Sequence, residues 1–354
     1  MAIQVDEKLE DLYELILRYC NLEPVQKLIR DYKDMELPKD KAEHLKITGK
    51  NAREVVTENL KRAVDRKVIP RENVLRLLQE AEENGNQHIF FFTTDNKASL
   101  KTLSDRDVIA VKLLGQRWKE SGRFPRLRLQ PKGYCWSDFR PTGTGGWIAK
   151  LYGHDTTEEE AGVERREENE RARWVKLITQ DIRLVCLARW SPNVQLLELR
   201  VADSRAKMLI GVLKQYLSAA VSVDDLCEPW DLSPVRQRLF NDNKKHADLY
   251  ECGDWLAIDP ESYVLQGGPH LQDPDEAVHA SQSTQKMISQ VAASNEHEKR
   301  RLVVHWKPTK ANGLKRSLRT ILGSASNTHE VIISAQASSQ AIDDVVDRLL
   351  QFEE

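Results

Sequence analysis

The sequence predicts an α+β protein, in which an N-terminal helical bundle is followed by a mixed, mainly antiparallel sheet region with packed helices. The first observation is that apolar residues recur at steps of three and four through the N-terminal part of the chain. The second is a hairpin at 181–203, DIRLVCLARW-SPN-VQLLELRVAD, whose arms alternate apolar and polar residues around a Ser-Pro-Asn turn. The third is that strand-like and helix-like patterns alternate in the C-terminal segment, residues 297–354.

The helical pattern defines a first domain at residues 1–94. Two amphipathic runs lie between residues 52 and 86, and the second has Pro70 near its start and Gly85 just beyond its end. The connecting segments are short and charged, which predicts a compact bundle of about four or five helices. At 88–95, HIFFFTTD, the pattern changes to a short β-rich apolar run, which places the domain boundary at its end.

A second, α+β domain is expected at residues 95–223. A helix is predicted at 104–122 and is followed by half-buried strands at 126–136 and 145–153. After the hairpin, a helix at 202–222 has apolar residues that can cover one face of a sheet.

The C-terminal part divides into an acidic, partly irregular segment, residues 224–296, and a β-α-β-α unit, residues 297–354, which we expect to pack on the sheet domain. The acidic segment has a polar, helix-like run at 277–294. The patterns of the last unit predict strands at 300–307 and 329–335 and helices at 313–323 and 339–352.

Composition excludes several classes of protein. The chain has 354 residues, of which 40% are hydrophobic and 31% charged, and its mean hydropathy is -0.56; these values are typical of a hydrated globular protein. No apolar run is long enough to span a membrane, and the acidic N-terminus does not resemble a signal peptide. The five cysteines are scattered and contain no CxxC pair, which indicates a reducing compartment. We therefore expect no membrane association, and a cytoplasmic, nucleoid-associated location, or a nuclear one if the source is eukaryotic.

The overall net charge of -2 hides a strong segregation of charge along the chain. Residues 1–94 are nearly neutral (net -2), whereas residues 96–150 carry 12 Lys/Arg against 4 Asp/Glu, a net charge of +8. Residues 151–172 are acidic (net -5), as are residues 224–276 (net -9), and residues 297–320 are basic (net +7). Two basic segments are therefore separated by acidic ones.

Motifs of common enzymes and cofactor sites are absent from the sequence. The Gly-rich segment 141–147, PTGTGGW, lacks the Gly-Lys-Ser/Thr ending of a phosphate-binding loop, and a hairpin turn is its expected role. The histidines do not combine with cysteines or acids at the spacing of a zinc site. We expect no cofactor and no resident metal. The sequence does not decide whether the protein is an enzyme, and it favours a non-enzymatic protein.

One acidic arrangement keeps a nuclease alternative open. Asp181, Glu198 and Arg200 imitate the order of acids and cation in metal-dependent nucleases, where two carboxylates hold Mg²⁺. Glu198 and Arg200 are two residues apart and share one face of a strand, but a solvent-exposed face with alternating charges gives the same pattern. The exposed face is the favoured interpretation, and a degenerate Mg²⁺-dependent nuclease using Asp181 and Glu198 is the alternative.

The basic segments give the better functional hypothesis. In residues 117–136 cations are interleaved with aromatic residues, so that cations can neutralise phosphates and aromatic rings can stack on bases or sugars. A strand at RLRLQ would present Arg126 and Arg128 on one face, and a helix at 313–323 would present three cations on one side. The predicted nucleic-acid-binding residues are Arg117, Lys119, Arg123, Arg126, Arg128, Lys132, Lys315, Arg316 and Arg319.

The order of segments resembles the centromere protein N family. The resemblance covers about two thirds of the chain in segment order and hydrophobic pattern, and the segments that carry it are 45–92 (LKITGKN…IFFF), 174–190 (WVKLITQDIRLVCLARW), 194–217 (VQLLELRV…KQYL) and 301–322 (RLVVHWKP…RTIL). The resemblance implies a pyrin-like helical domain followed by a mixed sheet domain. It also implies a non-enzymatic scaffold that binds duplex DNA and chromatin through a basic groove.

Two other functions stay open from the sequence. Helical domains of the death-fold kind bind proteins through charged faces, so the nearly neutral residues 1–94 are expected to bind a protein partner. A prokaryotic relative acting as an adaptor in antiviral defence, or in chromosome maintenance, is the remaining alternative.

Overall fold

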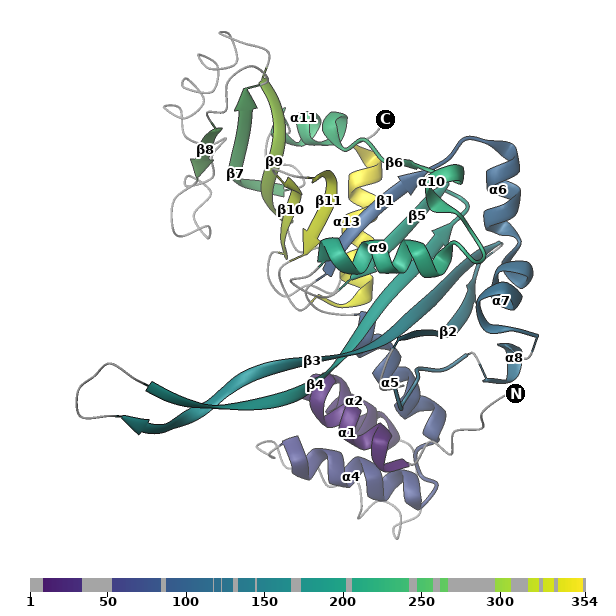
Figure 1. Ribbon diagram of the computed structural model, residues 1–354. Helices are drawn as coiled ribbons and strands as arrows, with labels where there is room; N and C mark the ends of the chain where they lie inside the picture. Colours follow the sequence, from purple (N-terminus) through teal and green to yellow (C-terminus); the bar gives the residue numbers. More distant parts are fainter. Residues whose placement is uncertain are drawn as a thin grey trace. The chain divides into compact units, whose positions relative to one another are not determined.

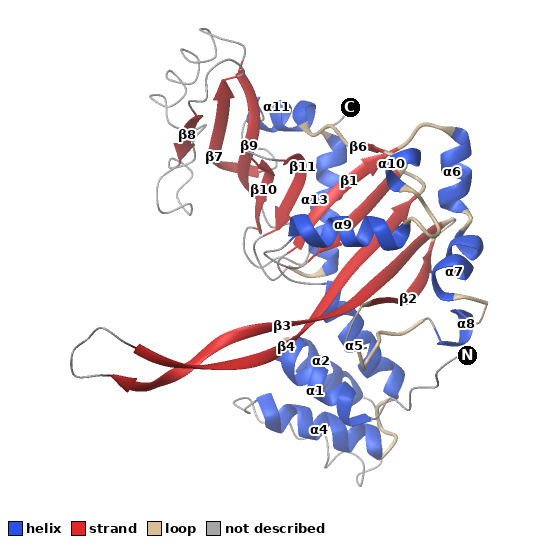
Figure 2. Cartoon of the chain, in the orientation of Figure 1, coloured by secondary structure: helices blue, strands red, loops and turns tan. Residues whose placement is uncertain are grey.

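The computed structural model describes residues 9–33, 53–83, 87–116, 118–121, 123–129, 133–143, 145–166, 173–201, 206–241, 247–256, 262–266, 297–306, 318–324, 327–333 and 337–352 (Figures 1 and 2). The chain forms two compact units. The first contains Met1–Gln79, Ala110–Pro141 and Ile148–Leu187, and the second contains Glu80–Ile109, Thr142–Trp147 and Ala188–Glu354. Both units draw on separate stretches of the chain, whereas the four domains predicted from the sequence were contiguous.

The N-terminal part of the first unit is helical, as the periodicity predicted. The helices are α1 (Leu9–Tyr19), α2 (Leu22–Lys33), α4 (Arg53–Asp65) and α5 (Arg71–Glu83), of which α5 belongs to this unit up to Gln79. Their apolar faces are buried, with Leu12, Ile29 and Leu60 each at 0% exposure. The helices therefore share an apolar core in the way that amphipathic helices of a bundle do.

The same unit also contains two short helical segments and three neighbouring strands. The first is α7 (Arg106–Leu114), which enters this unit at Ala110, and the second is α8 (Trp118–Ser121). The strands follow in the order β2 (Tyr134–Thr142), β3 (Gly146–Arg166) and β4 (Arg173–Ser191). The single helix expected at 104–122 is thus two shorter ones, interrupted at Gly115, which has the positive φ of +84° that favours glycine.

The acidic segment 151–172 contains more strand than its charge predicts. Residues up to Arg166 belong to β3, which forms a long ribbon with β4 (Figure 2). The loop between the two strands lies outside the described residues.

The second unit is built on an antiparallel sheet, in agreement with the predicted α+β class. Its described strands follow the order β5 (Leu196–Val201), β1 (Gln87–Thr93), β11 (Asn327–Ile333), β10 (Leu318–Ser324), β9 (His297–Trp306), β7 (Ala247–Leu256) and β8 (Ser262–Gln266), and the short β6 (Glu228–Pro229) also pairs with β1. The apolar run IFFF forms β1, which lies between β5 and β11. Ile89, Phe90, Phe91 and Phe92 are all buried, which explains why this strand is apolar at successive positions instead of alternating.

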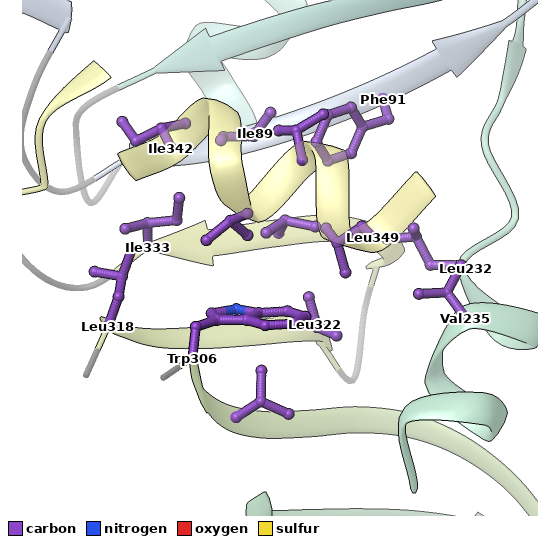
Figure 3. Packing of buried hydrophobic residues seen from close by; sticks show 14 of the residues in the cluster. Ile89, Phe91, Leu232, Val235, Trp306, Leu318, Leu322, Ile333, Ile342 and Leu349 are labelled. Atoms are coloured by element: carbon purple, nitrogen blue, oxygen red, sulfur yellow. The ribbon is translucent and has the colours of Figure 1, made fainter. Parts of the chain in front are cut away.

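Helices cover both faces of β1. On one face, α13 (Ser339–Gln351) packs Ile342 and Leu349 against a cluster that includes Phe91 and Trp306 (Figure 3). On the other face lies α9 (Ala206–Leu217), whose Lys214 places its ammonium 4.6 Å from the centroid of the Phe92 ring. The remaining helices of the unit are α6 (Lys97–Ser104), α10 (Val223–Leu226) and α11 (Ser233–Asn241).

Several predicted elements of this unit are confirmed. The hairpin at 181–203 forms through the end of β4, a turn at 192–195 and β5, and α9 and α13 occupy the helical patterns at 202–222 and 339–352. The predicted polar helix at 277–294 lies outside the described residues.

The predicted helix at 313–323 is wrong, because its described part, Leu318–Ser324, is the strand β10. Leu318, Thr320 and Leu322 are buried, whereas Arg319 and Ile321 are only partly covered, so exposure follows the two-residue period of a strand. Hydrogen-bonded neighbours on both sides, β9 and β11, decide the conformation of this short run. In its described residues, the C-terminal unit is therefore a β-meander followed by a helix, and the first predicted helix of the β-α-β-α arrangement is replaced by a strand.

Among the helices in the described part of the chain, none combines the length and the apolar character that a membrane crossing requires.

Candidate nucleic-acid interface

A completely buried ion pair lies next to the predicted basic surface of the first unit. Lys150 on β3 and Asp138 on β2 are both at 0% side-chain exposure, and Lys150 Nζ is 2.8 Å from Asp138 Oδ2. Lys150 Nζ also donates to the carbonyl oxygen of Gln79 on α5, at 2.9 Å. A further cation, Arg140, places its Nε 2.9 Å from Asp138 Oδ1. Several partners are needed here, because an unpaired charge in a protein interior costs several kcal/mol.

This buried cluster extends to the backbone of the basic segment, which we define as residues 123–129. Gln79 Nε2 donates to Asp138 Oδ1 at 2.7 Å and to the carbonyl oxygen of Arg123 at 3.0 Å. The Ser137 hydroxyl donates to the carbonyl oxygen of Phe124 at 2.8 Å. Two successive carbonyls of the basic segment are therefore attached to α5 and β2.

Asp138 adopts an uncommon backbone conformation. Its φ of +53° lies in the left-handed region, where a residue other than glycine is usually disfavoured, although aspartate tolerates it better than most. Such a conformation costs on the order of 1–3 kcal/mol and persists when the surroundings determine it. Here the contacts with Lys150, Gln79 and Arg140 provide those surroundings.

The side chains of the basic segment divide between core and solvent. Leu127 is buried, at 4% exposure, and Pro125 is buried as well. Arg123, Phe124 and Arg128 are exposed. The anchored backbone and the buried residues thus hold two cations and one aromatic ring at the surface.

Lys119 presents another cation in the same unit. It follows Trp118 on α8, and the indole of Trp118 is buried against the edge of Phe139, with ring centroids 5.1 Å apart and planes at 71°. Lys119 Nζ is 5.4 Å from the centroid of the Trp118 ring, within the range of a cation–π contact. The exposed ammonium is therefore positioned by a packed aromatic pair.

Arg128 is paired within the chain. Its Nε is 2.6 Å from Asp11 Oδ2 and its Nη2 is 3.3 Å from Asp11 Oδ1, which gives the two-point geometry that a guanidinium also uses with phosphate. Asp11 lies in the first turn of α1, 117 residues earlier in the chain. One of the predicted binding cations thus has an internal carboxylate as its partner.

The predicted strand at 126–136 is only partly correct. Residues 123–129 have no regular secondary structure and β2 begins at Tyr134, so Arg126 and Arg128 do not share a strand face. Arg126 instead directs its Nε to the carbonyl oxygen of Arg128, at 3.3 Å. Pro125 has no N–H donor, which disfavours pairing of this stretch with a neighbouring strand.

The other predicted binding residues lie outside the described residues or in the second unit. Arg117, Lys132, Lys315 and Arg316 lie outside the described residues. Arg319 lies on β10 in the second unit, opposite His305 of β9, and is partly covered. The proposed interface in the first unit is therefore made of Lys119, Arg123, Phe124, Arg126 and Arg128.

Glu198 and Arg200, which the sequence predicted as an exposed strand face or as part of a nuclease site, belong to a buried ion-pair network. Glu198 and Arg200 on β5 are buried at 2% and 3% exposure, so the exposed-face interpretation of this pair is wrong. Arg200 Nε donates to Glu198 Oε2 at 2.8 Å, and Arg200 Nη2 is 3.3 Å from Asp343 Oδ1 on α13. Arg189 on β4 completes the network through an ion pair with Asp343 and a 3.7 Å approach to Glu198 Oε1.

Electrostatics keep the Arg200 guanidinium of this network charged. Burial alone disfavours the charged form of Arg200, but the carboxylates of Glu198 and Asp343 outweigh it and raise the pKa of that guanidinium. The Glu198 carboxylate thus has an arginine as its partner where a nuclease would place Mg²⁺.

Asp181, the third member of the predicted acidic arrangement, belongs to the first unit. Its side chain is 76% exposed, with Oδ1 3.0 Å from His154 Nε2. No group of three or more His, Cys, Asp or Glu in the described part of the chain is arranged to hold a metal ion. The described residues thus give the nuclease alternative no metal centre.

The Gly-rich segment forms a turn, as predicted. It connects the end of β2 at Thr142 with the start of β3 at Gly146, and Gly143 and Gly145 have positive φ values of +51° and +77°. A Cβ on Gly146 would lie 2.4 Å from the carbonyl oxygen of Thr142, which leaves no space for a larger residue.

Three buried residues that support the interface were missed by sequence reasoning: Gln79, Asp138 and Lys150. Lys150 left a signal, because it is the one charged residue within the run WIAKLY, where burial of the neighbours predicts burial of the lysine too. Gln79 and Asp138 left none, because the hydrogen bond that joins them connects residues 59 positions apart in the sequence.

No family model matches this sequence, and no curated protein matches it either.

Proposed function

We propose that this chain is a non-enzymatic nucleic-acid-binding scaffold that contacts duplex DNA through the basic segment and Lys119. The observation that carries the proposal is the anchoring of the segment: the carbonyls of Arg123 and Phe124 are bonded to Gln79 and Ser137, while their side chains face solvent. When exposed cations on a fixed backbone bind phosphates, only their side chains lose conformational entropy, because the backbone is already ordered.

The charge of the region supports the same proposal. Residues 96–150 carry a net charge of +8, in a chain whose net charge is -2. Cations that neutralise phosphates release counterions, which makes the affinity depend steeply on salt. The exposed ring of Phe124 adds a surface that can contact sugars or unstacked bases.

This proposal includes two expectations from the resemblance to the centromere protein N family. The chain is a chromatin scaffold, and its helical part is pyrin-like.

The test is a mobility-shift titration with DNA and RNA duplexes at two salt concentrations, with Mg²⁺ present and the nucleic acid checked for cleavage. We expect the logarithm of affinity to fall with the logarithm of salt concentration at a slope of roughly -0.9 per phosphate contact, without cleavage. Reversal of Arg123, Arg126 and Arg128 to Glu is expected to abolish binding and leave the fold intact. Arg123 and Arg128 are exposed and Arg126 is only partly covered, and charges at such positions contribute little to stability.

A matched control changes the same charge elsewhere. Lys97, Lys101 and Lys112 are exposed on α6 and α7, and their reversal to Glu alters the net charge of the chain by the same amount. Equal loss of binding in both triple variants would show unspecific attraction, and unchanged binding in the first variant would remove the basic segment as the site.

A protein-interaction adaptor is the second candidate, and α1 provides the observation that favours it. Glu10 and Glu14 are exposed one turn apart on this helix, and such a pair repels phosphates but suits a protein surface with cations. Under this proposal a pull-down of a protein partner persists in the basic-segment variant and is lost when Glu10 and Glu14 are changed to Lys. Loss of the partner in the basic-segment variant alone would contradict it.

A further inference from the structure

We propose that Asp11 acts as an internal competitor of phosphate for Arg128, so that the basic segment binds nucleic acid by exchanging this carboxylate for a phosphate. The inference rests on the proposed function and concerns the regulation of the same site. The two-point contact of the Arg128 guanidinium with Asp11, at 2.6 and 3.3 Å, occupies the same N–H donors that a phosphate would use.

The exposure of the pair makes the exchange feasible. The side chain of Arg128 is 44% exposed and that of Asp11 is 23% exposed, so solvent and ligand reach the pair without any opening of the core. Ion pairs with this exposure are weak, because water screens the charges and ordering two side chains costs entropy. A phosphate, which carries comparable charge and geometry, can therefore replace the carboxylate.

After the exchange, the Asp11 carboxylate still has a favourable electrostatic environment. Asp11 lies in the first turn of α1, where the partial positive charge of the helix N-terminus favours a carboxylate. The release of Arg128 thus leaves Asp11 near a favourable dipole and in partial contact with water. The free energy needed to break the Asp11–Arg128 ion pair is therefore small.

The exchange also predicts that, before nucleic acid binds, fewer cations of the site are available to phosphate. With Arg128 neutralised, the exposed cations of the site are Lys119 and Arg123, together with the partly covered Arg126. A variant that lacks the Asp11 carboxylate removes the competitor beforehand and is expected to gain about one effective phosphate contact. The salt dependence of binding therefore reports on the exchange separately from the affinity.

The test compares wild type, Asp11→Asn, Arg128→Gln and the double variant in full-length protein, with fluorescently labelled duplex DNA at several salt concentrations. Asp11→Asn is expected to bind about two- to fivefold more tightly. The same change is expected to have no effect in the Arg128→Gln background, because the carboxylate acts through this guanidinium.

Glu14→Gln is the matched control, because it removes the same charge from an exposed position three residues further along α1. Equal gains in Asp11→Asn and Glu14→Gln, or an undiminished gain in the Arg128→Gln background, would show general electrostatics and overturn the exchange. Binding by wild type that Asp11→Asn leaves unchanged would overturn it as well. Absence of binding in every variant would instead remove the proposed function, and the exchange with it.

Discussion

Lys150 and Asp138 form an ion pair in which both side chains are completely buried, with Nζ and Oδ2 2.8 Å apart. The pair joins two neighbouring strands, β3 and β2, and through the carbonyl of Gln79 it also reaches helix α5. Because Gln79 in turn bonds the carbonyl of Arg123, a buried charge cluster and a charged surface segment are parts of one hydrogen-bonded network. Under the proposed function, changes that weaken this cluster should therefore affect both the stability of the unit and its binding of nucleic acid.

Lys150→Met is expected to destabilise the protein by about 3–5 kcal/mol, because it leaves the Asp138 carboxylate buried with fewer partners. Chemical denaturation followed by circular dichroism measures the loss. Lys119→Met, at an exposed lysine of the same unit, is the control and is expected to change the free energy of unfolding by less than about 0.5 kcal/mol. Equal small effects of both substitutions would show that the ion pair contributes little.

Gln79→Leu is expected to release the basic segment while keeping α5. The substitution removes the donor to the carbonyl of Arg123 and leaves Asp138 with one hydrogen bond fewer, at a cost of about 1–3 kcal/mol. Hydrogen exchange at residues 123–129 and tryptic cleavage after Arg123 should both become faster. Glu80→Leu, at the exposed neighbouring position, should alter neither, and slower exchange in the Gln79 variant would contradict the anchoring.

Sequence patterns predicted the elements whose periodicity and burial agree. The arms of the β4–β5 hairpin alternate around their turn, and α9 and α13 have apolar residues at helical spacing, so each was predicted correctly. The segment that forms β10 fits either period over its few residues, and its pairing with β9 and β11 decided between them. The sequence pattern of the segment itself carries no information about which strands pair with it.

The candidate site was predictable in composition but not in geometry. The cations and aromatic residues of 117–136 are visible in the sequence, whereas the partner of Arg128 is Asp11, 117 residues away. In the same way, alternation placed Glu198 and Arg200 correctly on one strand face but could not reveal that α13, with Asp343, covers that face. Contacts between distant segments determined which charges are exposed and which are buried.

Asp343→Asn tests how far the buried network of the second unit stabilises the position of α13. The carboxylate of Asp343 pairs with Arg189 and Arg200, so its removal leaves two guanidinium groups with Glu198 alone. We expect a loss of about 1–3 kcal/mol, as for a charged hydrogen bond that is broken in a partly buried site. Thermal unfolding measures it. Asp344→Asn, which removes the carboxylate that pairs with Arg348 on the same helix, is the comparison and should cost less.

Asp347→Asn is expected to have the opposite effect, and one that depends on pH. Burial, together with the negative charge of Asp343, raises the pKa of Asp347 in the folded protein. The unfolded chain releases this proton more readily, so the ionised carboxylate destabilises the fold above its folded pKa, and the penalty disappears below the ordinary pKa of aspartate. The amide carries no charge at any pH, so the midpoint of thermal unfolding should rise relative to wild type at pH 7.5. This difference should shrink as the pH falls towards 3. A midpoint that is unchanged at pH 7.5, or a difference that grows on acidification, would show that Asp347 is not held in an unfavourable ionised state.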